Sequence, residues 1–286
     1  MARSLKPEHL KKYLKGGELH RLFEVIREDP ELSFEIRRDN DAMVYFNKKR
    51  ILTISESRNK TKIEPLSANY YNKETGDFSW VDTFKREDWN KKDLIRTYFS
   101  KAKKYAYKES RKAEFQLQQS VALGNCSFDG KGRYVVVDME WAFSQAGLKD
   151  KISRTRPDLV IVDTQRNELG KNDIFLAEVK LGIGATEGKS GLQDHVDKTY
   201  DIYNCPQACD ALIEDTKSII EQKTELRILK GEKPLFDFSE KPRMMFILGY
   251  RSDNELKELK EQVSKIILKG MGDPVCVYID TREVLV

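Results

Sequence analysis

The sequence lacks any long apolar run. No stretch approaches the ~18 consecutive apolar residues that a membrane-spanning helix requires. The opening residues, MARSLKPEHLKKYLKGG, carry basic side chains without the apolar core of a secretory signal. These two absences predict a cytoplasmic protein that does not enter a membrane.

Cysteine is scarce as well, with four in 286 residues. Only Cys205 and Cys209 stand close together, and no further Cys or His beside them completes a zinc site. We therefore expect ordinary reduced cysteines, which suit a reducing compartment. The sequence also contains no internal repeat, low-complexity tract or heptad run.

An excess of one charge sign is missing too. Charged residues make up 34 % of the chain, yet Lys and Arg (51) exceed Asp and Glu (47) by only four. This balance is compatible with a polyanionic partner but does not argue for one, because a basic patch acts locally. The length and the 39 % hydrophobic share indicate a globular protein with one large or two modest domains.

Residues 1–88 predict a small α+β domain. A helical stripe is followed by three short alternating runs, LSFEIRR, AMVYFN and RILTIS, which turn residues separate. The stripe consists of Leu19, Leu22, Phe23 and Ile26. We therefore expect a helix and an antiparallel meander. The polar stretch from about residue 56 to 88 is expected to be a connector.

Residues 89–286 predict a second domain with a mixed α/β fold. A long helix is expected over 91–122, followed by strands over 133–143, 156–164 and 173–182. Helices come next, over 191–203 and then to about residue 230. The strand RMMFILGY, a helix over 255–269 and the strand VCVYID complete the chain. This order predicts a mixed sheet flanked by helices.

Acidic residues gather at one end of the three predicted strands. Side chains alternate between the two faces of a strand, so Glu178 and Lys180 share a face, as do Asp138 and Glu140. Asp158 opens the middle strand. If the strands form a meander, Asp158, Glu178, Lys180 and Glu140 converge.

Such a cluster favours a metal-dependent reaction. Neighbouring carboxylates repel one another and are costly to bury, and a hard divalent cation removes this cost. Mg²⁺ or Mn²⁺ would need only one or two carboxylates and would lower the pKa of a bound water. Lys180 could orient that water or neutralise developing charge. The residues therefore predict phosphodiester hydrolysis, against the simpler alternative of an exposed Glu-Lys pair.

The segments RPDLVIVD and FLAEVK resemble the signature of the PD-(D/E)XK nuclease superfamily, whose restriction-endonuclease-like core has the order αβββαβ. The resemblance covers about residues 91–250. It implies that Asp158 and Glu178 are metal ligands and that Lys180 is the catalytic lysine. More narrowly, ELSFEIRRDNDAMVYF, VVVDMEWAF and EVKLG leading into GKSGLQDHV are similar to poorly characterised bacterial proteins with this domain, for which no substrate is implied.

Members of the superfamily often add an acid from the first core helix or the first strand. Glu140 is the candidate on the strand. The predicted helix over 91–122 has an apolar stripe that consists of Leu94, Tyr98, Ala102, Tyr105 and Ala113. Glu109 lies within this stripe, whereas Glu114, with Gln118 one turn on, better resembles the pattern of the family. The choice between Glu109 and Glu114 stays open.

Gly188-Lys189-Ser190 looks like part of a nucleotide-binding loop, but G-x-x-x-x-G-K-S/T requires a glycine where this chain has Ile183. No nucleotide cofactor is therefore expected. Lys189, Ser190 and the first N–H groups of the next helix could instead contact a substrate phosphate, or form a plain capped turn. His195 on that helix is expected to be structural or to contact phosphate, because a metal-activated water needs no histidine base.

The sequence thus predicts a metal-dependent nuclease that acts on DNA. Phosphate contacts are expected from Arg156 and Lys189, and from five further basic residues: Lys101, Lys104, Lys108, Arg111 and Arg154. The alternative is a catalytically inactive protein of the same fold that binds nucleic acid or regulates. DNA versus RNA, endonuclease versus exonuclease action, and the oligomeric state, a homodimer included, stay open.

Overall fold

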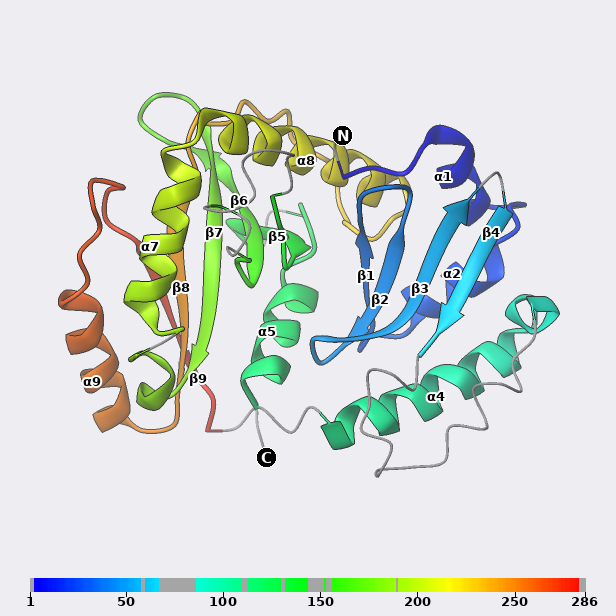
Figure 1. Cartoon of the computed structure of the whole chain (residues 1–286), viewed down its shortest axis with the longest axis horizontal. Helices are drawn as coiled ribbons and strands as arrows, with labels where there is room; N and C mark the ends of the chain where they lie inside the picture. The colour runs from blue at the N-terminus through cyan, green and yellow to red at the C-terminus, as the bar shows by residue number, and fades with distance from the viewer. Residues whose placement is uncertain are drawn as a thin grey trace. The chain divides into compact units, whose positions relative to one another are not determined.

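A computed structural model describes residues 3–57, 60–66, 86–109, 113–129, 132–143, 152, 156–188 and 190–282 (Figure 1). The chain forms two compact units. The first comprises Met1–Phe115 and Ser218–Leu229, and the second comprises Gln116–Lys217 and Lys230–Val286. The expected boundary at residue 88 therefore falls inside the first unit.

A four-stranded antiparallel sheet forms the centre of the first unit. Its strands follow chain order: β1 (Ser33–Ile36), β2 (Ala42–Phe46), β3 (Lys49–Ser57) and β4 (Lys60–Pro65). The residues of the two tight turns, Asp39-Asn40 and Asn47-Lys48, have positive φ angles. Asn and Asp tolerate this conformation, which matches the twist of paired strands. The three predicted strands are therefore present.

The fourth strand lies where the sequence predicted a connector. Its residues, KTKIEP, alternate between exposed and more buried positions, but three of the six are charged. Charge on an edge strand prevents pairing with another chain, and it also hides the strand from a search for apolar alternation. Residues 67–85 of the expected connector lie outside the described residues.

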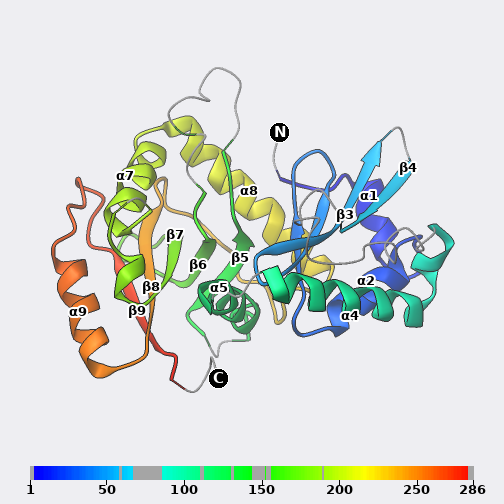
Figure 2. The same ribbon diagram turned by 60° about the horizontal axis from the view of Figure 1, so that its bottom comes forward.

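Helices cover the sheet of the first unit. These are α1 (Pro7–Tyr13), α2 (His20–Glu28), α4 (Lys92–Glu109) and the short 3-10 helix η2 (Arg86–Asn90). Figure 2 shows α2 and α4 side by side. The buried side of α4 is centred on Ile95, Tyr98 and Ala102, whereas Leu94, which the sequence placed on that side, is 37 % exposed.

The second unit contains a five-stranded mixed sheet in the order β5-β6-β7-β8-β9. β5 (Tyr134–Met139), β6 (Leu159–Arg166) and β7 (Asn172–Leu181) are antiparallel, whereas β8 (Arg243–Tyr250) and β9 (Val275–Asp280) extend the sheet in parallel. Nine of the ten residues of β7 are buried, as a strand covered on both faces requires. The predicted mixed α/β fold is confirmed at this level.

Helices lie on both faces of this sheet. α7 (Leu192–Tyr203) and α9 (Asp253–Ser264) pack on one face, where Leu192, Val196 and Leu259 form a cluster with Phe246 and Leu248 of β8 (Figure 1). α5 (Ala113–Gly124) lies on the other face: a Cβ added to Gly249 would stand 2.7 Å from the side chain of Leu117.

The predicted helix over 91–122 corresponds to α4 and α5, and residues 110–112 between them lie outside the described residues. The predicted helix to about residue 230 is α8 (Pro206–Glu225), which contributes its first twelve residues to the second unit and the rest to the first. None of the helices in the described ranges is long and apolar enough to cross a membrane.

Candidate functional site

The pairing of β6 with β7 determines where the two candidate metal ligands lie. The pairing ends with Leu159 opposite Ala177, and Asp158 and Glu178 are the next residues along the two segments. The backbone N–H of Val179 also donates to Oδ2 of Asp158 at 3.0 Å, which ties this carboxyl group to β7. Asp158 and Glu178 are therefore neighbours at the end of the β6–β7 pair.

Glu140 lies at the same level on the next strand. Met139 is opposite Leu159, and the N–H of Glu140 donates to the carbonyl of Asp158 at 3.0 Å. The φ angle of Glu140 is +51°, however, so strand alternation ends at this residue. The backbones of Glu140, Asp158 and Glu178 lie close together at this end of the sheet, but the direction of the Glu140 side chain does not follow from the pleat.

Lys180 shares its face of β7 with Glu178. Its Nζ lies 3.8 Å from Oε2 of Glu178, and the two residues are 7 % and 3 % exposed. Asp158 is 6 % exposed. The sequence-based alternative of an exposed Glu-Lys pair on a solvated sheet face is therefore wrong: the charges are buried, and burial of charge requires partners.

His195 is the partner that α7 supplies. Its Nδ1 lies 2.7 Å from Oε1 of Glu178, with the imidazole side chain 14 % exposed. Burial, and then the nearby Lys180 ammonium, lower the pKa of His195 to about 4, although Asp158 acts in the opposite direction. The ring is therefore neutral at pH 7, with Nδ1 within hydrogen-bonding distance of the Glu178 carboxyl group. Within the described residues, the other ring nitrogen, Nε2, is buried and has no hydrogen-bond partner.

Gln118 of α5 supports Asp158 from the opposite face of the sheet. This glutamine is 2 % exposed, and its Nε2 donates to the backbone carbonyl of Asp158 at 3.0 Å. Glu114 lies one turn earlier in the same helix and is half-buried. The side chain of Glu109, the other helix candidate, lies outside the described residues.

The donor set suits a magnesium-type ion better than a structural zinc ion. In the part of the chain that the structure describes, no group of three or more His, Cys, Asp and Glu side chains could hold a metal ion together. Zinc in a structural site requires four such ligands. Mg²⁺ accepts one or two carboxylates and completes its shell with water and phosphate oxygens. Asp158 and Glu178, two adjacent hard oxygen donors, fit this requirement.

The glycine-rich loop after β7 is bonded to an acidic side chain at the start of α7. Gly182, Gly188 and Ser190 have positive φ angles, and α7 begins after Gly191. The carboxylate of Asp194 accepts from the N–H of Ser190 at 3.0 Å and also pairs with Lys198. An anion of the protein therefore already lies at the helix end where a phosphate was expected. Lys189 lies outside the described residues.

The basic residues expected to contact phosphate are only partly described. The described ones among them are exposed: Arg156, Lys101 and Lys104. The side chain of Lys108 and the residues Arg111 and Arg154 lie outside the described residues.

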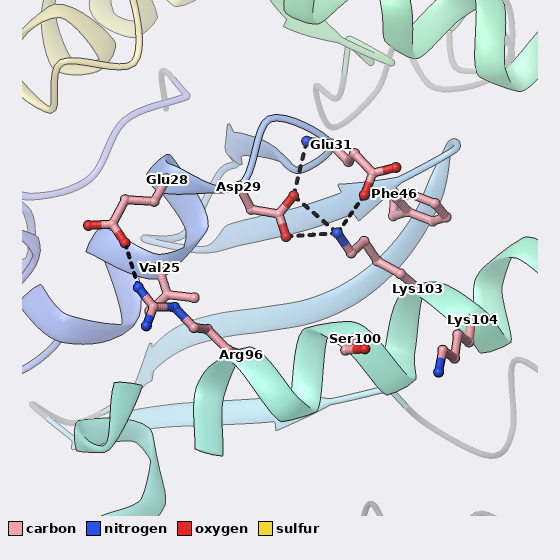
Figure 3. Close-up of a pocket in the computed structure, with 9 residues that line it drawn as sticks. All are labelled: Val25, Glu28, Asp29, Glu31, Phe46, Arg96, Ser100, Lys103 and Lys104. Carbon is pink, nitrogen blue, oxygen red and sulfur yellow. Dashed lines mark hydrogen bonds and ion pairs between the residues drawn. The ribbon is translucent and has the colours of Figure 1, made fainter. Parts of the chain in front are cut away.

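On α4, neighbouring basic residues are already ion-paired. A cleft of about 740 Å³ in the first unit contains Lys103, whose Nζ lies 2.8 Å from Asp29 and 2.6 Å from Glu31 (Figure 3). Arg96 pairs with Glu28 at 3.1 Å in the same cleft. These acids neutralise this part of the helix.

The sequence drew attention to His195 but not to its contact with Glu178. A signal was present, because His195 lies three residues after Leu192 and four before Thr199, both on the buried side of α7. Comparison of the chain with protein-family models, curated proteins and solved structures found no match. The geometry of this cluster is therefore the basis for inferring function.

Proposed function

We propose that the chain is a Mg²⁺- or Mn²⁺-dependent nuclease that hydrolyses phosphodiester bonds, with DNA as its substrate. The observation that supports this best is the adjacency of Asp158 and Glu178 at the end of the β6–β7 pair, with Lys180 3.8 Å from Glu178. Two carboxylates and a lysine at one point are costly to bury. A divalent cation bound between the carboxylates would offset this cost.

The order of elements in the second unit supports the same proposal. α5, the antiparallel strands β5, β6 and β7, then α7 and the parallel strand β8 follow the αβββαβ order of the PD-(D/E)XK proteins that the sequence resembles. We therefore propose a restriction-endonuclease-like core for this unit. Asp158 precedes the second strand of the meander and Glu178 lies in the third, as the resemblance implies.

Each residue has a definite role in this proposal. Asp158 and Glu178 would hold the cation, whose chemistry is to lower the pKa of a bound water and to neutralise negative charge on phosphate. The ammonium of Lys180 stabilises the charge that develops on the phosphate during attack. The N–H of Val179 holds the carboxylate of Asp158, and His195 holds that of Glu178.

The test is cleavage of plasmid, linear and single-stranded DNA, and of RNA, with Mg²⁺, Mn²⁺ or EDTA. Asp158→Asn and Glu178→Gln should each reduce cleavage by about 10²-fold or more, since either removes a proposed cation ligand. Asp173→Asn is the matched control: Asp173 is a buried carboxylate of the same strand that bonds to Ser239 and Arg243 instead. Cleavage that survives both site substitutions would refute the assignment.

The second candidate is a protein of the same fold that binds nucleic acid or regulates without turnover. The observation that favours it is burial, since Asp158, Glu178 and Lys180 are each less than 10 % exposed and a scissile phosphate must reach them. Binding of nucleic acid by the wild type, with no metal-dependent cleavage of any of the substrates, would support this candidate over the first.

A further inference from the structure

His195 is held against the candidate site by the packing of α7. Leu192 and Val196, which flank it on the helix, are buried against Phe246 and Leu248 of β8. β8 is the parallel neighbour of β7, with Phe246 opposite Glu178. The packing of α7 on β8 therefore places the imidazole beside Glu178.

The contact with Glu178 is made by the nitrogen nearer the backbone. Nδ1 lies 2.7 Å from Oε1 of Glu178, a distance typical of a charge-assisted hydrogen bond, and Lys180 stands 3.8 Å from the other oxygen. An N–H donor of this kind orients a carboxylate and stabilises its negative charge. Donors behind metal ligands commonly change metal affinity by about 10- to 100-fold.

We propose that His195 is a positioning residue of the cation site: its Nδ1–H fixes the carboxylate of Glu178 so that Glu178 and Asp158 can bind one divalent ion. This inference rests on the proposed function, because it assumes that the two carboxylates are cation ligands. It goes beyond that function by assigning the strength of cation binding to a residue outside the Asp158, Glu178 and Lys180 set.

The alternative is that the imidazole only fills space between α7 and the sheet. Substitutions that keep or remove a donor at the position of Nδ1 distinguish this packing role from the positioning role. The amide nitrogen of asparagine occupies the position of Nδ1, so His195→Asn keeps a donor for Glu178. The amide nitrogen of glutamine corresponds to Nε2, and leucine fills the space without a donor. If His195 acts through Nδ1, asparagine should restore what leucine and glutamine lose.

The experiment is a titration of the metal-free full-length chain with Mn²⁺ alone, with free Mn²⁺ measured by electron paramagnetic resonance. Wild type should bind, and Asp158→Asn should bind much more weakly. His195→Leu and His195→Gln should bind about 10- to 100-fold more weakly than wild type, and His195→Asn should stay close to wild type. Urea unfolding of each variant tests whether it is folded.

Each result decides the matter. Wild-type affinity in His195→Leu, together with weak binding in Asp158→Asn, would overturn the positioning role and leave the proposed function standing. Rescue by glutamine but not asparagine would overturn the assignment to Nδ1. No Mn²⁺ binding by wild type, or binding unaffected by both Asp158→Asn and Glu178→Gln, would overturn the proposed function as well. If His195→Leu does not fold, the asparagine and glutamine variants still decide.

Discussion

Each of the two compact units buries a histidine against a glutamate. In the first unit, Nδ1 of the fully buried His9 contacts Glu56, and its Nε2 lies 3.5 Å from the hydroxyl of Tyr13. Glu56 also accepts from Lys12 at 2.9 Å. In the second unit, His195 contacts Glu178 through Nδ1, but its Nε2 has no hydrogen-bond partner in the described part of the chain.

The buried lysines differ in the same way. Nζ of Lys223 lies 2.7 Å from Glu35 in the first unit, whereas Nζ of Lys180 lies 3.8 Å from Glu178 in the second. Buried polar groups that are fully paired stabilise a fold, and groups that are incompletely paired are costly unless a ligand completes them. The comparison teaches that similar residues, buried to a similar extent, form a close lysine–glutamate ion pair in the first unit and a longer one in the second.

The largest loss of stability is expected at Lys223, which has the shorter ion pair of the two buried lysines. Lys223→Met should lower the free energy of unfolding by about 3–5 kcal/mol, because it leaves the buried carboxylate of Glu35 without its close cation. Urea unfolding measures this. Glu35→Gln combined with Lys223→Met removes both charges and should recover most of the loss. An equally unstable double variant would show that the charge pair is not the cause.

Lys180→Met should affect cleavage more than stability, in contrast to Lys223→Met. We expect cleavage to fall by about 10²- to 10³-fold, because the ammonium stabilises developing charge. The free energy of unfolding should fall by less than in Lys223→Met, since the ion pair of Lys180 within the described residues is the longer one, at 3.8 Å. Cleavage rates and urea unfolding on the same preparation test both parts. A loss of stability equal to that of Lys223→Met would break the comparison between the two units.

Acid should reduce the stability contributed by both buried histidines, His9 and His195. Burial lowers the pKa of His9 and lowers that of His195 to about 4, so the unfolded chain takes up protons first as the pH falls below about 6.5. Their contribution to stability is complete above pH 6.5 and should decline below it, for His195 on the order of 1 kcal/mol per pH unit down to about pH 4.

Unfolding of the metal-free protein between pH 7 and 4.5 measures this decline. His9→Asn and His195→Asn should each flatten the profile, since each removes one titrating group. A wild-type profile that is flat over this range would contradict the expected burial of both rings.

The smallest effect is expected at the support behind Asp158. Gln118→Leu should cost about 1 kcal/mol, because the carbonyl of Asp158 loses one donor but keeps the N–H of Glu140. Gln116→Leu, a substitution in the same helix, serves as the control. Urea unfolding and the cleavage rate should both change only in Gln118→Leu, and an equal effect of the two substitutions would remove Gln118 from the site.

Local sequence pattern was sufficient for most elements of the fold. The strands RMMFILGY and VCVYID, residues 243–250 and 275–280, have the predicted boundaries, because apolar β-forming runs between turn residues are local signals. β4 escaped detection because its charged edge carries little apolar signal. The sequence also did not predict that Ser218–Leu229 belongs to the first unit. This assignment depends on contacts between segments far apart in the chain, such as the hydrogen bond of Gln222 with Leu5.

The sequence by itself determined which residue types could meet: alternation in β7 placed Glu178 and Lys180 on one face, and Asp158 opened the neighbouring strand. Only the tertiary structure decided the register that brings Asp158 close to Glu178, the burial of the cluster, and the approach of His195 and Gln118. The reason is physical. Side-chain direction along a strand follows from local geometry, whereas register, burial and contacts from another helix depend on packing between segments far apart in the chain.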